Sequence, residues 1–308
     1  MIEVSTVYIL GAGASEPYDY PLGRELRTNI VDNLRQNRSK RKEILDLDLG
    51  YSEGEIIQFA DDLYKSNTYT IDDFLKSNDD KGDILKVAIA QVLIPREIKK
   101  NLSQENNPKH WYRLLNRNLQ TPSFEDFLDN RVKIITFNYD RSLEENLFIS
   151  QQSLHRKTFD VEILMEFPIL HVFGKLGDLD WENPEGRAYD HTLCTGGNLR
   201  SAAEGIRTLH EDDRKILKEA EDFLDWADEI YFLGFGYDIT NLQRLNVFKL
   251  SERLNPINNE LIRKKVEGTA VRLSNSQKST IKQFFNNNIN LGDENEDCKK
   301  IMERWYGP

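Results

Sequence analysis

The chain has 308 residues, of which 39% are hydrophobic, 10% aromatic and 30% charged, and its formal net charge at pH 7 is −11. This composition is typical of a globular chain with much helical surface, and it excludes an intrinsically disordered one. The acidic balance argues against a nucleic-acid-binding surface, because neutralising phosphates requires a basic face.

Two cysteines are too few for a disulfide framework or a four-cysteine zinc ribbon, and we expect no metal. No apolar run approaches the length of a membrane span, and the first residues lack the pattern of a signal sequence. We therefore expect a cytoplasmic protein that binds neither membranes nor nucleic acid directly.

The predicted elements alternate between strand and helix, apart from one long helical stretch. Residues 6–10 form a near-continuous apolar run, typical of a central parallel strand, and a helix is predicted over 24–35. Residues 40–130 carry apolar side chains at helical spacing, and we predict an α-helical insertion within a single domain spanning 1–308. Further strands are predicted at 132–137, 169–173, 229–233 and 269–273, with helices at 140–148, 276–285 and 293–305. The alternation favours an α/β fold with a doubly wound, Rossmann-like parallel sheet.

Four of these strands end in small or polar residues, and ligands bind just beyond the carboxyl ends of parallel strands. The four groups are Gly11-Ala12-Gly13-Ala14-Ser15, Thr136-Phe137-Asn138-Tyr139-Asp140, His171 with Gly174, and Gly234-Phe235-Gly236. Together they predict one crevice with a phosphate site, an Asn/Asp pair and a histidine.

In the first group, glycines let the main chain approach a pyrophosphate, and backbone N–H groups can form an anion site. Glu16 occupies the third glycine position of the usual dinucleotide fingerprint, so a simple tight turn remains an alternative. Pro17 and Pro21 delay the next helix and suggest a segment that folds over a ligand.

The other groups also allow two interpretations each. Asn138 and Asp140 can fix a ribose hydroxyl, a water or an amide, or they can cap the following helix. His171 can act as a general base near neutral pH, or it can be an ordinary hydrogen-bonded core residue. The glycines after residue 233 allow close approach by a ribose or adenine, or they form a plain turn.

In this order and spacing the four groups resemble the sirtuin-like family, in particular its divergent bacterial branch of NAD-consuming anti-phage defence proteins. Two departures weaken the alternative of a protein deacylase. The chain cannot build the four-cysteine zinc module of deacetylating sirtuins, and their acidic-Phe-Arg element is replaced by Tyr20-Pro21-Leu22-Gly23-Arg24. Their His-Gly pair is also wider here, as His171-Val172-Phe173-Gly174.

The resemblance implies a zinc-independent NAD hydrolase that cleaves the nicotinamide–ribose bond, giving nicotinamide and ADP-ribose. It implies that Asn138 and Asp140 organise the nicotinamide ribose and the attacking water, and that His171 is the catalytic base. Residues implied to bind NAD are Gly11, Ala12, Gly13, Ala14, Ser15, Thr136, Gly234, Phe235 and Gly236, with Gly11, Ala12, Gly13 and Ser15 holding the phosphates.

The resemblance also implies self-assembly into a homo-oligomer or a separate defence partner, such as a HerA-type ATPase. The main alternative is a non-catalytic sensor that binds NAD or ADP-ribose and regulates a partner in a defence complex. A hydride-transferring dehydrogenase is disfavoured, because the glycine fingerprint is incomplete.

Overall fold

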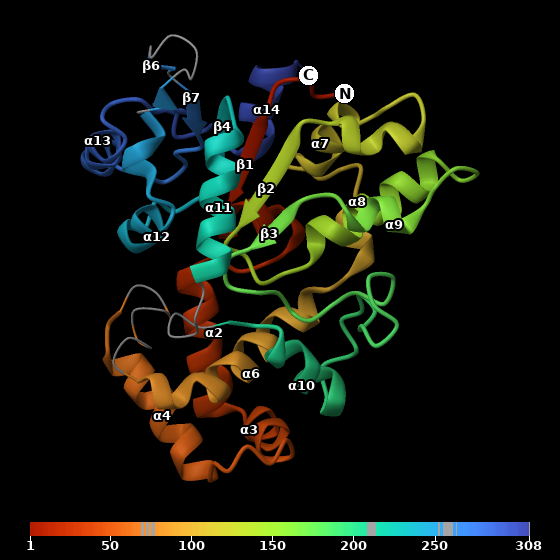
Figure 1. Ribbon diagram of the computed structural model, residues 1–308. Helices are drawn as coiled ribbons and strands as arrows, with labels where there is room; N and C mark the ends of the chain where they lie inside the picture. Colours follow the sequence, from red (N-terminus) through yellow and green to blue (C-terminus); the bar gives the residue numbers. More distant parts are fainter. Residues whose placement is uncertain are drawn as a thin grey trace.

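Parallel strands form the centre of the computed structural model, which describes residues 1–68, 71, 74, 78–207, 214–251, 253–254, 261–262 and 264–307 (Figure 1). The six strands of the main sheet are β1 (Thr6–Leu10), β2 (Val132–Thr136), β3 (Ile169–His171), β4 (Glu229–Leu233), β7 (Lys265–Gly268) and β8 (Asn290–Leu291). They are all parallel, and their order is β3-β2-β1-β4-β7-β8. This confirms the predicted doubly wound, Rossmann-like α/β fold.

The described helices separate and follow these strands. They are α1 (Ala12–Ser15), α2 (Gly23–Gln36), α3 (Arg38–Leu45), α4 (Glu53–Lys65), α6 (Gly82–Leu93), α7 (Tyr112–Asn118), α8 (Ser142–Leu154), α9 (Val161–Met165), α10 (Gly196–Glu204), α11 (Arg214–Trp226), α12 (Ile239–Arg244), α13 (Asn275–Phe284) and α14 (Cys298–Tyr306). A short antiparallel pair, β5 (Arg253–Leu254) with β6 (Leu261–Ile262), stands apart from the main sheet.

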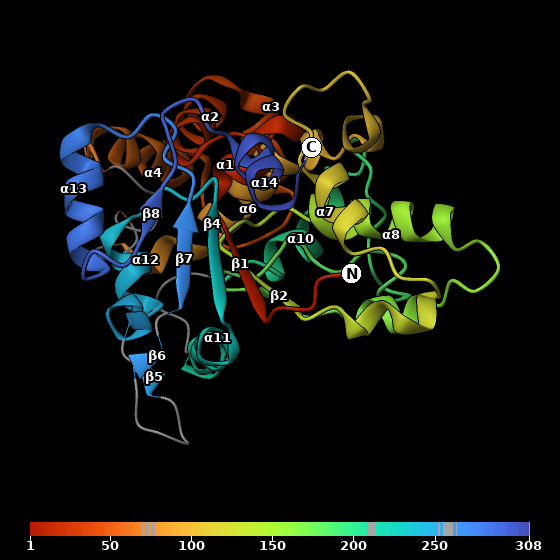
Figure 2. The same ribbon diagram turned by 90° about the horizontal axis from the view of Figure 1, so that it is seen from above.

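Alternation along the strands divides the core into two layers. Tyr8 of β1 belongs to one buried cluster with Ile301 of α14, and its neighbour Val7 belongs to the other with Phe223 of α11. All five residues of β1 are buried, as expected for a strand covered on both faces. Figure 2 shows α11 and α14 on opposite sides of the sheet.

Most of the helices between β1 and β2 form a separate layer. Figure 1 shows α3, α4 and α6 together with α10 beyond the carboxyl ends of the strands, and α2 running from the sheet into this layer. α6 packs against α2 and α10, and α2 packs against α4. The side chains of Leu26, Ile30 and Leu34 give α2 a buried stripe at helical spacing.

The prediction for the fifth strand was wrong in position. The strand is Lys265–Gly268, and residues 269–273 form a turn in which Arg272 has a φ of 65°. The strand carries two charged residues in four positions, so it lacks the apolar run that identifies a central strand. β3 also ends at His171, two residues earlier than predicted, and β8 was missed because two residues give no period.

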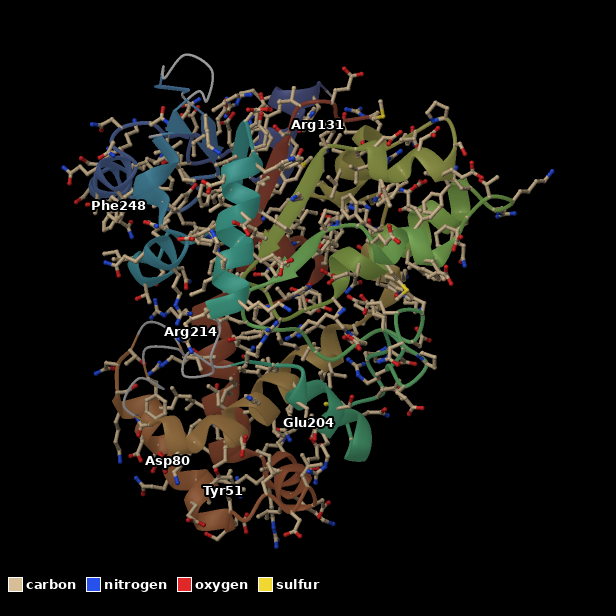
Figure 3. All side chains as sticks on the ribbon, in the orientation of Figure 1. Tyr51, Asp80, Arg131, Glu204, Arg214 and Phe248 are labelled. Carbon is tan, nitrogen blue, oxygen red and sulfur yellow. The ribbon has the colours of Figure 1, made fainter. Side chains whose placement is uncertain are left out.

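The carboxyl ends of the strands point toward the helical layer, so they lie in the interior of the molecule (Figure 1). Arg131, which directly precedes β2, and Tyr51, in the helical layer, mark opposite ends of the protein in Figure 3. Within the described ranges, no helix is both long and apolar enough to cross a membrane.

Candidate functional site

The switch point of the sheet lies between β1 and β4, because the chain builds outward from β1 through β2 and β3 before returning to β4. The loops that follow β1 and β4 are in direct contact there. Gly13 N–H donates to the carbonyl oxygen of Gly234 at 2.9 Å. A Cβ on Gly234 would lie 2.0 Å from the nitrogen of Ala14, and Gly234 has a φ of +58°. These glycines therefore let two loops pack backbone to backbone.

This packing corrects the expected phosphate site. The N–H groups of Gly11, Gly13 and Ala14 donate to the main-chain oxygens of Leu233, Gly234 and Gly11, at 3.1, 2.9 and 2.8 Å. Of the four residues expected to hold the phosphates, Gly11 and Gly13 thus have their N–H groups engaged within the protein.

A central cavity of about 230 Å³ opens between the two glycine loops, the end of β2 and the helical layer. The strand ends supply Gly11, Ala12, Ser15, Phe137, Asn138, Tyr139, Asp140, Phe235 and Gly236 to its wall, and the helical layer supplies Leu26, Ile71 and Leu93. Three of the four predicted strand ends therefore meet in one cavity with several residues each, and the fourth contributes Phe173.

The polar part of this wall is a hydrogen-bonded cluster of three side chains. Asn138 Nδ2 donates to Ser15 Oγ at 2.9 Å and to the carbonyl oxygen of Gly11 at 3.0 Å. Asp140 Oδ1 accepts hydrogen bonds from the main-chain N–H of Ser142, at 3.1 Å, and from its hydroxyl. Ser15 also hydrogen-bonds to Asp140.

Burial raises the pKa of Asp140 above its ordinary value, although the hydrogen bonds from Ser142 and Ser15 oppose this change. A buried carboxyl group with a raised pKa, facing a cavity, has the properties of a proton acceptor. The predicted helix-capping alternative is partly correct, because Asp140 also binds the first N–H of α8.

Aromatic rings form another part of the wall. The ring centroid of Phe137 lies 5.2 Å from that of Phe235 and 5.6 Å from that of Phe173, both with edge-to-face geometry. All three rings line the central cavity. This apolar surface suits a flat heteroaromatic ring.

The segment predicted to fold over a ligand is anchored by two buried tyrosines. Tyr18 stacks on Tyr112 with centroids 4.0 Å apart, and Tyr20 OH lies 2.7 Å from Tyr189 OH. Tyr20 and Pro21 line the central cavity, so in this structure the segment is a fixed wall of it.

A second, outer cavity of about 280 Å³ lies on the other side of the glycine loops, and it shares Ala12, Gly23, Phe235 and Gly236 with the central one. Lys109 and Arg272 also line it, and their side chains lie 3.1 and 3.4 Å from the carboxylate of Glu16. The outer cavity thus combines two cations and two acidic residues, Glu16 and Asp297, with the apolar side chains of Leu22, Val271 and Leu273.

His171 lies in neither cavity, which corrects the expectation that its imidazole faces the same crevice as Asn138 and Asp140, although Phe173 from the same strand end lines the central cavity. Its Nδ1 is 3.0 Å from the main-chain oxygen of Asn138, and its Nε2 is 2.5 Å from Oε1 of Glu144. The ring lines a third, lateral cavity of about 360 Å³, together with Glu144, Lys175 and Arg207. The imidazole therefore contacts the main chain of Asn138, whereas the carboxamide of Asn138 faces the glycine loop.

Two other predicted NAD-binding residues, Thr136 and Ala14, accept hydrogen bonds from within the protein. Thr136 Oγ1 accepts the N–H of Asn138 at 3.1 Å, and the carbonyl oxygen of Ala14 accepts the indole N–H of Trp111 at 2.7 Å. Neither residue is among the described residues that line the central or outer cavity.

Sequence reasoning missed Tyr20 and Asp238 in the central cavity, Lys109 and Arg272 in the outer one, and Glu144. Asp238 had a detectable signal, because its side chain accepts the N–H of Asn241 as the N-cap of α12. Among the residues that the structure describes, no group of three or more His, Cys, Asp or Glu side chains is arranged to hold a metal ion.

Comparison of the sequence with protein-family models and with curated proteins gave no match.

Proposed function

We propose that this protein is an NAD glycohydrolase, which cleaves the nicotinamide–ribose bond of NAD to give nicotinamide and ADP-ribose. The observation that carries the proposal is the Ser15–Asn138–Asp140 cluster, placed in a cavity that adjoins a second one across the glycine loops. A dinucleotide has two nucleoside halves joined by a pyrophosphate, and two adjoining cavities at a switch point suit that shape.

In this proposal the nicotinamide ribose lies in the central cavity, beside Asn138 and Asp140, and the adenosine lies in the outer cavity. The pyrophosphate crosses the shared wall at Ala12 and Gly236. A Cβ on Gly236 would meet nothing within 4 Å, so this glycine borders open space. Lys109 and Arg272 supply the positive charge for the phosphates, in exchange for their contacts with Glu16.

The chemistry requires a stabilised ribosyl cation and an oriented water. When the bond between ribose C1′ and the nicotinamide nitrogen breaks, its electron pair leaves with nicotinamide, and positive charge develops on the ribose. The carboxylate of Asp140 stabilises that charge, and Asn138 fixes a ribose hydroxyl or the water. As the water oxygen bonds to C1′, its proton passes to Asp140 and then to solvent.

The direct test is incubation of the purified protein with NAD, with nicotinamide and ADP-ribose measured together by chromatography. We expect equal amounts of both products from the wild-type protein. We expect none above background from Asn138→Ala or Asp140→Asn, with circular dichroism showing that both variants are folded. Unchanged release by both variants would contradict the site assignment.

One observation favours a second candidate, a sensor that binds NAD or ADP-ribose without turnover. His171, the residue that the family resemblance implies as the base, does not line the central cavity, and both of its ring nitrogens have partners. Calorimetric binding of intact NAD, with no product formed over hours, would favour the sensor.

The physiological part of the proposal follows from the resemblance to NAD-consuming defence proteins. We propose that the protein depletes NAD during phage infection, either as a homo-oligomer or together with a partner such as a HerA-type ATPase. Light scattering of the purified protein tests self-assembly. Nicotinamide release measured with and without the products of neighbouring genes tests the need for a partner.

A further inference from the structure

Glu144 is a buried acid that no sequence signal singled out, and its partner is His171. The side chains of Glu144 and His171 are only 6% and 8% exposed, and they lie 2.5 Å apart. Glu144 belongs to the first turn of α8, whereas His171 ends β3, so the contact joins a helix to the edge strand of the sheet.

Both ring nitrogens of His171 face hydrogen-bond acceptors. Nδ1 faces the main-chain oxygen of Asn138, which can only accept a hydrogen bond, so Nδ1 carries a proton. Burial alone would raise the pKa of Glu144, but His171 and Lys175 outweigh it and lower this pKa to about 2. Glu144 is therefore ionised near neutral pH and accepts hydrogen bonds, so Nε2 also faces an acceptor. The imidazole is thus held between the main-chain oxygen of Asn138 and the carboxylate of Glu144, and neither nitrogen faces the central cavity.

The same ring is joined to the central cavity through a single residue. The main-chain oxygen of Asn138 accepts from His171, and the side chain of Asn138 donates to Ser15 and to the glycine loop. We propose that Glu144 and His171 form a positioning pair. Glu144 orients the imidazole, the imidazole holds the main-chain oxygen of Asn138, and this fixes the carboxamide of Asn138 for the reaction. This inference rests on the proposed function for its kinetic consequence, but its structural consequence can be measured without NAD.

The neighbouring Glu145 provides a matched control. It lies on the same turn of α8 and its side chain is fully buried, but its contacts are with Trp181 Nε1, at 3.1 Å, and Lys99 Nζ, at 2.7 Å. Neither Trp181 nor Lys99 is among the described residues that line the central cavity. Glu144→Gln and Glu145→Gln thus remove a carboxylate from adjacent positions, and of the two side chains Glu144 is the one that contacts His171.

The first experiment is hydrogen–deuterium exchange of the free protein. We expect faster amide exchange over residues 136–141 and 11–15 in Glu144→Gln than in the wild type, and no change there in Glu145→Gln. Equal exchange over these residues in all three proteins would overturn the positioning pair, whether or not the protein hydrolyses NAD.

The second experiment is steady-state nicotinamide release. A displaced carboxamide is expected to lower kcat by about 10- to 100-fold with KM changed less than about threefold in Glu144→Gln, because such misplacement affects the reacting geometry more than binding. Glu145→Gln should stay within about twofold of the wild type. Wild-type kcat in Glu144→Gln would overturn the inference, whereas absence of release by the wild type itself would count against the proposed function alone.

Substitution of the histidine separates positioning from base catalysis. The side-chain amide of His171→Gln can still donate to the oxygen of Asn138 but cannot accept a proton near pH 7. We expect His171→Gln to retain about tenfold more activity than His171→Ala, with the pH profile of the wild type. Equal loss in both variants, with loss of the acidic limb of the profile in His171→Gln, would show that His171 is the base and would overturn our assignment.

Discussion

Two regions at the carboxyl end of the sheet hold their loops in different ways. At the switch point, the loops after β1 and β4 pack through main-chain atoms, with Gly13 and Gly234 in direct contact. At the ends of β2 and β3, buried charges replace this close packing: Glu144 pairs with His171, and Glu97 pairs with two arginines.

The second of these charged groups is fully enclosed. Arg141 donates to Glu97 through Nε at 3.0 Å and Nη2 at 2.8 Å, and Arg187 Nη2 donates to Glu97 at 2.9 Å. Glu97 comes from the helical layer, Arg141 follows Asp140, and Arg187 belongs to the loop after β3. Main-chain packing holds a loop independently of pH. Buried charges hold a loop only while each charged partner is present and ionised.

The largest expected effect is at the buried charges near the ends of β2 and β3. Glu97→Gln leaves two buried guanidinium groups without a carboxylate, and we expect it to lower the free energy of unfolding by about 3–5 kcal/mol. Urea denaturation measures this loss. Asp19→Asn removes the partly exposed ion pair with Arg96 and should cost less than about 1 kcal/mol. A similar small loss in both variants would remove the distinction between the two regions.

On the switch-point side, Gly234→Ala should lower the free energy of unfolding by about 2–4 kcal/mol, because the new Cβ meets Ala14 and the residue keeps a left-handed φ. Gly236→Ala is the control, since its Cβ would have open space, and we expect a change within about 0.5 kcal/mol. Equal melting temperatures for the two variants would argue against backbone packing as the role of Gly234.

A smaller expected effect is the pH dependence of the stability that Glu144 contributes. The pKa of Glu144 is about 2 in the folded protein and 4.5 ordinarily, so its contribution to stability is complete above 4.5 and is lost as the pH falls toward 2. The stability difference between the wild type and Glu144→Gln should therefore be full above about pH 5 and shrink steadily below that value. Denaturant titrations across this range measure it. A difference that stays constant down to about pH 2 would show that Glu144 titrates normally.

The smallest predicted effect concerns the exposed cations of the outer cavity. Arg272→Ala should raise KM for NAD about two- to tenfold and leave kcat unchanged, because an exposed cation contributes little to binding and nothing to the reacting centre. Arg156→Ala, at an exposed position after α8, is the control and should change neither constant. A fall in kcat without a change in KM for Arg272→Ala would contradict the placement of the adenosine half.

Sequence reasoning found the fold and the central cavity wherever the local signal was strong. The continuous apolar run of β1, followed by glycines, fixed the switch-point loop, and the end of β2 located Asn138 and Asp140. It could not place the imidazole of His171, because that depends on Glu144, which lies 27 residues earlier on a helix. Two glutamates at a helix start ordinarily indicate a solvated face.

The outer cavity was missed for a related reason. Arg272 and Leu273 lie in a turn that the apolar pattern of residues 269–273 suggested was a strand, and Lys109 comes from the segment between β1 and β2. Tertiary packing brings these residues together, and no local period of the sequence reports it.

The most direct test of this account is nicotinamide release from NAD by the wild-type protein and by Asn138→Ala, measured beside a melting curve for each. We predict equimolar nicotinamide and ADP-ribose from the wild type and no release from a folded Asn138→Ala. Equal rates from the two proteins would contradict a reaction centred on the Asn138–Asp140 end of the central cavity.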